Sequence, residues 1–159
     1  MRKSADPIAQ LMQEHDRALV KLKQLNRAAF AFSQDGYSTT YYRQIKSALR
    51  FIEEEVSIHN HKEEAALFPI MERYVEGPTR IMRSDHKKLK KGFSQLREAV
   101  HRVELNRDSF AAIKQLRAVA KSVVQLFVNH IHKENYILFP LVQRFLSKEE
   151  LREVARKML

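Results

Sequence analysis

The sequence predicts an all-α fold, an antiparallel up-and-down four-helix bundle followed by a short fifth helix. Its 159 residues include only 3 glycines and 4 prolines, so little interrupts long helices. In four separate segments, apolar residues recur at intervals of three and four, which is the spacing of one helix face. Short connections between long helices favour antiparallel neighbours. We therefore expect a single domain over residues 1–159, with the core bundle at about 7–145.

Local signals at helix ends place the first two helices. The first, expected over about 7–32, opens with Asp6 as its cap and Pro7 at its first position. A short polar loop with one glycine follows. The second is expected over about 39–75, where Pro69 should kink its last turns.

The remaining helices follow in the same way. A Gly-Pro pair separates the second helix from the third, which should end near Glu104. The fourth helix is expected over about 109–145. Ser147 and Glu150 have the spacing of a capping box, which predicts a C-terminal helix over about 148–158.

Each of the four apolar stripes contains histidine at a position where a core residue is expected, and two also contain glutamate. The apolar positions predicted to form the core are Leu11, Leu19, Leu22, Leu25, Ile45, Leu49, Ile52, Val56, Ala66, Ile70, Met82, Leu89, Phe93, Leu96, Val100, Leu116, Ala120, Val123, Phe127, Ile137 and Leu141. The polar positions in the same stripes are His15, His59, Glu63, His86, His130 and Glu134. Polar groups therefore belong to the core of this bundle.

An internal repeat relates these polar residues. Residues 59–69 read HNHKEEAALFP and residues 130–140 read HIHKENYILFP, with 7 of 11 positions identical at an offset of 71. The same offset relates His15 to His86. A constant offset predicts two similar helix pairs that face each other about a pseudo-twofold axis, with the six polar side chains around one point.

This pattern of residues points to a metal site. Histidine and glutamate four positions apart lie on the same helix face. Buried carboxylates are costly and repel each other, and the core stripes contain no lysine or arginine to pair with them. Imidazole with carboxylate suits iron, manganese or zinc. The six donors fit either one six-coordinate metal or two metals with two histidines each and both carboxylates shared. A metal-free, hydrogen-bonded polar layer is the competing interpretation.

The doubled His-x-x-x-Glu motif followed by Leu-Phe-Pro, with single histidines on the first and third helices, resembles the hemerythrin-like (HHE cation-binding) family. The resemblance covers roughly residues 8–145. It implies a non-haem di-iron centre with an oxo or hydroxo bridge, for which zinc or manganese could substitute. The implied terminal ligands are His15, His59, His86 and His130, and the implied bridging carboxylates are Glu63 and Glu134.

One departure from the family pattern bears on function. Oxygen-carrying members have a second histidine one turn from the first on the third helix, where this sequence has Met82 and Lys90. We therefore expect a more open centre that meets O₂, NO or peroxide in sensing, redox or nitrosative stress, or iron handling. Whether the protein is an enzyme is left open. Members that repair iron–sulfur clusters often carry a cysteine-containing N-terminal extension, and this sequence has no cysteine.

Several neighbouring residues are assigned no role in the centre. His61 and His132 lie about 200° around the helix from the predicted ligands, so we expect them on the outer face or in a layer around the ligands, and not among the ligands themselves. Lys62 and Lys133 are expected to be solvated. Tyr136 is expected in the core, with a position next to the centre as the alternative. The Leu-Phe-Pro segments are expected to serve packing and helix-end geometry.

Composition limits the remaining possibilities. The absence of cysteine excludes disulfides, zinc–thiolate sites and cysteine nucleophiles. No apolar run approaches the roughly 20 residues of a membrane span, so we expect a cytoplasmic protein and no membrane partner. The net charge is +10, and six basic residues lie within 80–91. Charge alone is a weak motif, and we interpret these residues first as a solvated helical surface. The alternative function is an interaction module with a stabilising metal whose basic surface binds nucleic acid or an acidic partner. Oligomeric state is not predicted.

Overall fold

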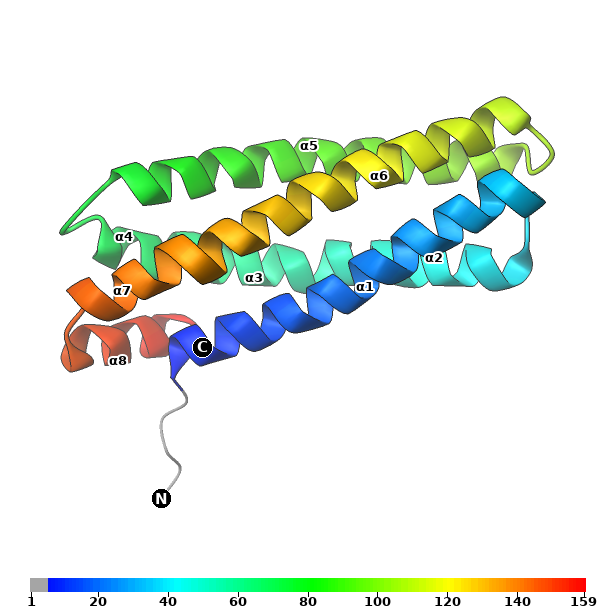
Figure 1. Cartoon of the computed structure of the whole chain (residues 1–159). Coiled ribbons are helices and arrows are strands. Elements are labelled where there is room, and N and C mark those ends of the chain that lie inside the picture. Colours follow the sequence, from blue (N-terminus) through cyan, green and yellow to red (C-terminus); the bar gives the residue numbers. More distant parts are fainter. Residues whose placement is uncertain (1–5) are drawn as a thin grey trace, which may run out of the picture.

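The structure of the chain is a computed structural model that describes residues 6–159. The described residues form helices and no strand, so the predicted all-α class is confirmed. Long helical segments lie lengthwise beside one another, and the chain reverses direction at the loops between them (Figure 1). None of the helices in residues 6–159 combines the length and the apolar content that a membrane span requires.

The first helix, α1 (Pro7–Asp35), begins where the sequence predicts. The backbone N–H of Ile8 donates to the Asp6 carboxylate at 3.0 Å, so Asp6 caps the helix as expected. The helix ends three residues later than predicted. Gly36 terminates it with a φ of 84°, a left-handed conformation that glycine adopts without strain.

The second long segment is continuous but not uniformly α-helical. It consists of α2 (Thr39–Phe51), η1 (Ile52–Val56), α3 (Ser57–Lys62), η2 (Glu63–Leu67) and α4 (Phe68–Met71). The elements η1 and η2 are π-helical turns, in which the hydrogen bond spans one residue more than in an α-helix. The segment ends at Met71, earlier than the expected 75, shortly after Pro69.

The second half of the chain has a similar construction, with one π-helical turn in its second long segment in place of two. It contains α5 (Gly77–Leu105), α6 (Phe110–Lys133), η3 (Glu134–Leu138) and α7 (Phe139–Phe145). Ser109 caps α6, since its hydroxyl accepts from the backbone N–H of Ala112 at 3.1 Å. The π-helical turn η3 lies at the same place in the repeat as η2, and each turn ends at the leucine of its Leu-Phe-Pro segment.

A short helix, α8 (Lys148–Lys157), follows and lies beside α7 and the start of α1, at one end of the molecule (Figure 1). Both hydrogen bonds of the predicted capping box between Ser147 and Glu150 are present, at 3.2 and 3.0 Å. The helix packs against α1 and η2. Its buried Val154 joins an apolar cluster that includes Ile8 and Leu11 of α1.

Two apolar clusters make up the core. One fills the end nearer the α1–α2 and α5–α6 loops, and the other fills the end that α8 covers. The predicted core positions are buried or half-buried, with one exception. Ile137 is 56% exposed, so that prediction is wrong. The π-helical turn η3 inserts an extra residue after Glu134, and Leu138 is buried in its place.

Candidate metal centre

The six polar residues of the stripes meet between the two apolar clusters. They come from six different elements, with His15 on α1, His59 on α3, Glu63 on η2, His86 on α5, His130 on α6 and Glu134 on η3. All six are buried, with exposed fractions of 7% or less. Their donor atoms form two groups of four, and within each group all donor atoms lie within 4.8 Å of one another. One group is His15, His59, Glu63 and Glu134, and the other is Glu63, His86, His130 and Glu134.

Each carboxylate contacts one histidine from each group. Glu63 Oε1 is 3.3 Å from Nε2 of His59 and 3.3 Å from Nε2 of His86. Glu134 Oε1 is 3.0 Å from Nε2 of His15 and 3.3 Å from Nε2 of His130. The two glutamates therefore lie between the histidine pairs, which is the position that a bridging carboxylate needs.

Buried polar atoms at the centre lack hydrogen-bond partners. Within residues 6–159, no hydrogen bond reaches either carboxylate oxygen of Glu63 or Glu134, or Nε2 of His86 or His130. The histidine–glutamate contacts at 3.0 and 3.3 Å are close but do not have hydrogen-bond geometry. Leaving two carboxylates unsatisfied in a dry interior costs several kcal/mol. Cations bound among these atoms would remove that cost, so the residues present fit a metal site.

The titration of the centre reflects the same charge imbalance. Burial alone would lower the pKa of His59, but the Glu63 carboxylate raises it to about 10. His130 is also buried, yet Glu134 raises its pKa to about 9. Burial favours a raised pKa for Glu134, but the neighbouring Glu63 carboxyl and the His130 ring hold it well below its ordinary value. Without a metal, protons on the histidines supply the positive charge that the carboxylates need.

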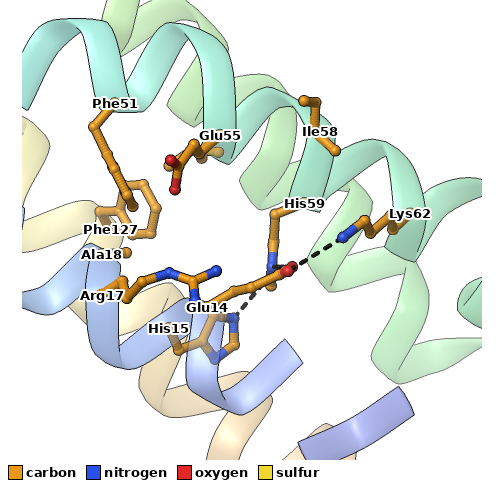
Figure 2. Close-up of a pocket in the computed structure, with 11 residues that line it drawn as sticks. Glu14, His15, Arg17, Ala18, Phe51, Glu55, Ile58, His59, Lys62 and Phe127 are labelled. Atoms are coloured by element: carbon orange, nitrogen blue, oxygen red, sulfur yellow. Dashed lines mark hydrogen bonds and ion pairs between the residues drawn. The ribbon is translucent and has the colours of Figure 1, made fainter. Parts of the chain in front are cut away.

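A layer of oxygen acceptors surrounds the histidines. Each ring donates its Nδ1–H outward, from His15 to Asn135 at 2.7 Å, His59 to Glu14 at 3.0 Å, His86 to Glu64 at 2.8 Å and His130 to Asp85 at 3.1 Å. Figure 2 shows the contact between His59 and Glu14. With Nδ1 carrying the proton of the neutral ring, the Nε2 lone pair faces the centre and is available to a metal.

Two lysines belong to this layer. The Lys62 side chain is 19% exposed, less than expected of a solvated lysine, whereas the Lys133 side chain is 41% exposed and so remains partly solvated as expected. Lys62 Nζ donates to Glu14 at 3.2 Å, and Lys133 Nζ donates to Asp85 at 3.0 Å. Each lysine partly offsets the charge of the acid that holds a histidine. The sequence contained a signal for these acids, because Glu14 and Asp85 directly precede His15 and His86 and are 71 positions apart.

Other expectations near the centre have mixed outcomes. His61 and His132 are exposed, as predicted. Tyr136 is 75% exposed, so its expected place in the core is wrong; its ring packs against His132 instead, with centroids 5.7 Å apart. Met82 is buried and Lys90 exposed at the two positions beside His86.

The aromatic residue of each Leu-Phe-Pro segment has a packing role. The Phe68 ring stacks on His86 with centroids 5.7 Å apart, and the Phe139 ring stacks on His15 at 5.5 Å. Each phenylalanine therefore supports a histidine of the opposite helix pair.

Two surface cavities, each of about 420 Å³, reach the histidines from outside. The first opens between α1 and the α2–α3 segment and is lined by His15 and His59 together with Arg17 and apolar side chains (Figure 2). The second is lined by His86 and Glu64. A small molecule could therefore approach each half of the centre.

The basic segment 80–91 is partly neutralised. Arg83 pairs with Glu72 at 2.9 Å, and Arg80 pairs with Glu76 at 3.4 Å. Four lysines of the segment are exposed, namely Lys87, Lys88, Lys90 and Lys91.

Comparison with known proteins gives consistent matches. The family model of the hemerythrin HHE cation binding domain matches residues 6–142. The chain is 27% identical over 135 residues to the iron-sulfur cluster repair protein YtfE of Yersinia pestis (strain Pestoides F), covering 82% of this chain and 61% of YtfE. It is also 27% identical over 110 residues to the iron-sulfur cluster repair protein DnrN of Neisseria gonorrhoeae, covering 67% of this chain and 70% of DnrN. The match thus spans about three fifths of the length of YtfE.

Proposed function

This chain belongs to the hemerythrin HHE cation-binding domain family, and on that basis we propose that it is a non-haem di-iron protein. Its centre would meet O₂, NO or peroxide in sensing, in the response to redox or nitrosative stress, or in iron handling. The fold proposed for it is an antiparallel up-and-down four-helix bundle with α8 as a short fifth helix. The chain reversals between the long helical segments support this topology (Figure 1).

One observation carries the two-metal proposal. Glu63 and Glu134 are fully buried and belong to both groups of donors, while each group has two histidines of its own. One metal in a six-donor cage would not require two overlapping groups. Two metals that share both carboxylates would use every donor and satisfy the carboxylate oxygens that otherwise lack partners.

The side chains have distinct roles in this proposal. His15 and His59 would hold one metal through Nε2, and His86 and His130 would hold the other. Glu63 and Glu134, which belong to both groups of donors, would be shared by the two metals and would neutralise part of their charge. When bound, two iron ions supply electrons and coordination positions for a small ligand. The surrounding apolar clusters keep bulk water from the buried carboxylates, and the two cavities admit small molecules.

The comparisons narrow the kind of iron handling. Both YtfE and DnrN are named iron–sulfur cluster repair proteins. We include iron–sulfur cluster repair among the proposed roles of this chain, in which case the iron of the cluster would be cargo and distinct from the resident metals.

Metal analysis of anaerobically prepared protein tests the proposal. We expect about two iron ions per chain and an absorption spectrum that changes on addition of O₂, NO or azide. Glu63→Ala or Glu134→Ala should lower the iron content, since each removes a donor from both groups. His61→Ala and His132→Ala are the matched controls, because these exposed histidines come from the same two helical segments and should leave the iron content nearly unchanged.

Two results would contradict the proposal. A protein that binds only zinc, with no spectrum that responds to ligands, would not be a di-iron protein. Equal loss of metal in all four variants would show that the donors are not the residues named here.

A further inference from the structure

The two halves of the candidate centre are alike in most of their supporting contacts. His59 and His130 each donate to a carboxylate that also pairs with a lysine. His15 and His86 each stack on a phenylalanine. The cavities beside the two halves have the same volume, about 420 Å³. The first cavity is lined by both His15 and His59, whereas the second is lined by His86 and not by His130. The packing of the histidines therefore does not distinguish the halves, although access to them differs.

The acceptor of one histidine in each half breaks this similarity. His86 donates to the carboxylate of Glu64 at 2.8 Å, whereas His15 donates to the carboxamide of Asn135 at 2.7 Å. Glu64 and Asn135 occupy equivalent positions of the repeat, 71 residues apart. The His86–His130 half is thus supported by two carboxylates and the His15–His59 half by only one.

A hydrogen bond to a carboxylate makes an imidazole a stronger metal ligand than a hydrogen bond to a neutral amide does. Outer partners of this kind typically change metal affinity by about 10- to 100-fold. The Glu64 side chain is 41% exposed, so solvent screens part of its charge and we expect the lower end of that range. The cations of Arg17 and Lys90 line the two cavities, but within the described residues neither donates a hydrogen bond to a histidine of the centre.

We propose that the two metal positions are inequivalent: the His86–His130 half binds its metal first and more tightly, and the His15–His59 half holds the metal that exchanges. Glu64 and Asn135 are positioning residues that set this order. The inference rests on the proposed two-metal site. Beyond that site, it states which half loses its metal first and that Glu64 and Asn135 determine this order.

Stepwise loading with Zn²⁺ tests the order without any assay of activity. With ¹⁵N-labelled histidine, one equivalent of Zn²⁺ added to the metal-free protein should shift the ring nitrogen signals of His86 and His130. The signals of His15 and His59 should follow only with the second equivalent, with the two steps separated by roughly 10-fold in affinity.

Two isosteric substitutions supply the variants. Glu64→Gln keeps an acceptor oxygen but removes the charge, so it should weaken the first step about 10-fold and abolish the order. Combining it with Asn135→Asp should reverse the order, which a merely structural role of either residue would not do. Glu53→Gln is the matched control. Its carboxylate lines the same cavity as Glu64 but pairs with Arg97, at 2.6 Å, and should not affect the order.

The outcomes separate the two proposals. Binding of fewer than two Zn²⁺ ions per chain would contradict the two-metal site itself. Binding of two ions with His15 and His59 responding first, with all four histidines responding together, or with no change in the double variant, would overturn only the inequivalence.

Discussion

A hydrogen bond at Nδ1 of each central histidine decides which ring nitrogen faces the centre. Neutral imidazole has one donor and one acceptor nitrogen, and a carboxylate can only accept. Asp85 is only 3% exposed and receives hydrogen bonds from both His130 and Lys133. Its Oδ2 atom accepts both hydrogen bonds and therefore holds the His130 ring with Nε2 directed inward. The two donors offset the cost of burying the acid.

Removal of this acid tests the role of the outer layer. Asp85→Ala should lower metal affinity about 10- to 100-fold, because His130 loses the acceptor that orients it and increases its basicity. Titration against a chelating indicator measures the change. Glu98→Ala on the same helix is the control, since this exposed acid pairs with Arg102 at 2.7 Å and, among the residues that the structure describes, has no contact with the centre. Equal affinity in the two variants would show that Asp85 does not support the centre.

At the scale of elements, π-helical turns carry both carboxylates. Glu63 and Glu134 are the first residues of η2 and η3. In each case the carbonyl of the glutamate accepts from the backbone N–H of the phenylalanine five residues later, in Leu-Phe-Pro. The proline that follows has no N–H to donate, so the ordinary α-helical ladder is already interrupted there. The wider turn therefore links the position of each glutamate to that of the phenylalanine five residues later. That phenylalanine stacks on a histidine of the other helix pair.

The helix α8 covers the end of the molecule that carries η2, and its packing contributes to stability there. Val154 on α8 is fully buried, so Val154→Ala should lower the free energy of unfolding by on the order of 2 kcal/mol through lost burial and a residual cavity. Urea denaturation of the metal-free protein measures this change in the free energy of unfolding. Val20→Ala, at a position that is 66% exposed, makes the same chemical change and should cost less than about 0.5 kcal/mol. Similar losses in both variants would mean that α8 does not pack as described.

For the molecule as a whole, the periodicity and the internal repeat of the sequence predicted which residues are buried. They did not predict which side chains on different helices contact each other. The stripes and the offset of 71 predicted that His15, His59, His86 and His130 would be buried with the two glutamates, and the structure brings these six together. The predicted burial of Ile137 was wrong because uniform α-helical spacing does not anticipate a π-helical turn. The prediction for Lys62 was wrong because its partner, Glu14, lies on α1, and the periodicity of the helix that carries Lys62 contains no information about residues on another helix.

The charge balance of the whole centre leads to a dependence of stability on pH. The folded-state pKa values of His59 and His130, about 10 and about 9, exceed the ordinary value of 6.5. Their contribution to stability is therefore fully present below about pH 6.5 and is lost as the pH rises toward 10. The lowered pKa of Glu134 has the opposite sense, so its contribution is present above about 4.5 and is lost as the pH falls below that value.

We accordingly expect the metal-free protein to have its highest melting temperature between about pH 4.5 and 6.5, and to lose stability from there to pH 10. The metal-loaded protein should behave differently, because metal replaces the protons and binds more weakly as the pH falls. Thermal melts of both forms across this range, in 0.5 M salt that screens surface charges but not buried ones, make the comparison. A melting temperature of the metal-free form that stayed constant or rose from pH 6.5 to 10 would contradict the argument. It would mean that protons on His59 and His130 do not balance the buried carboxylates when the metal is absent.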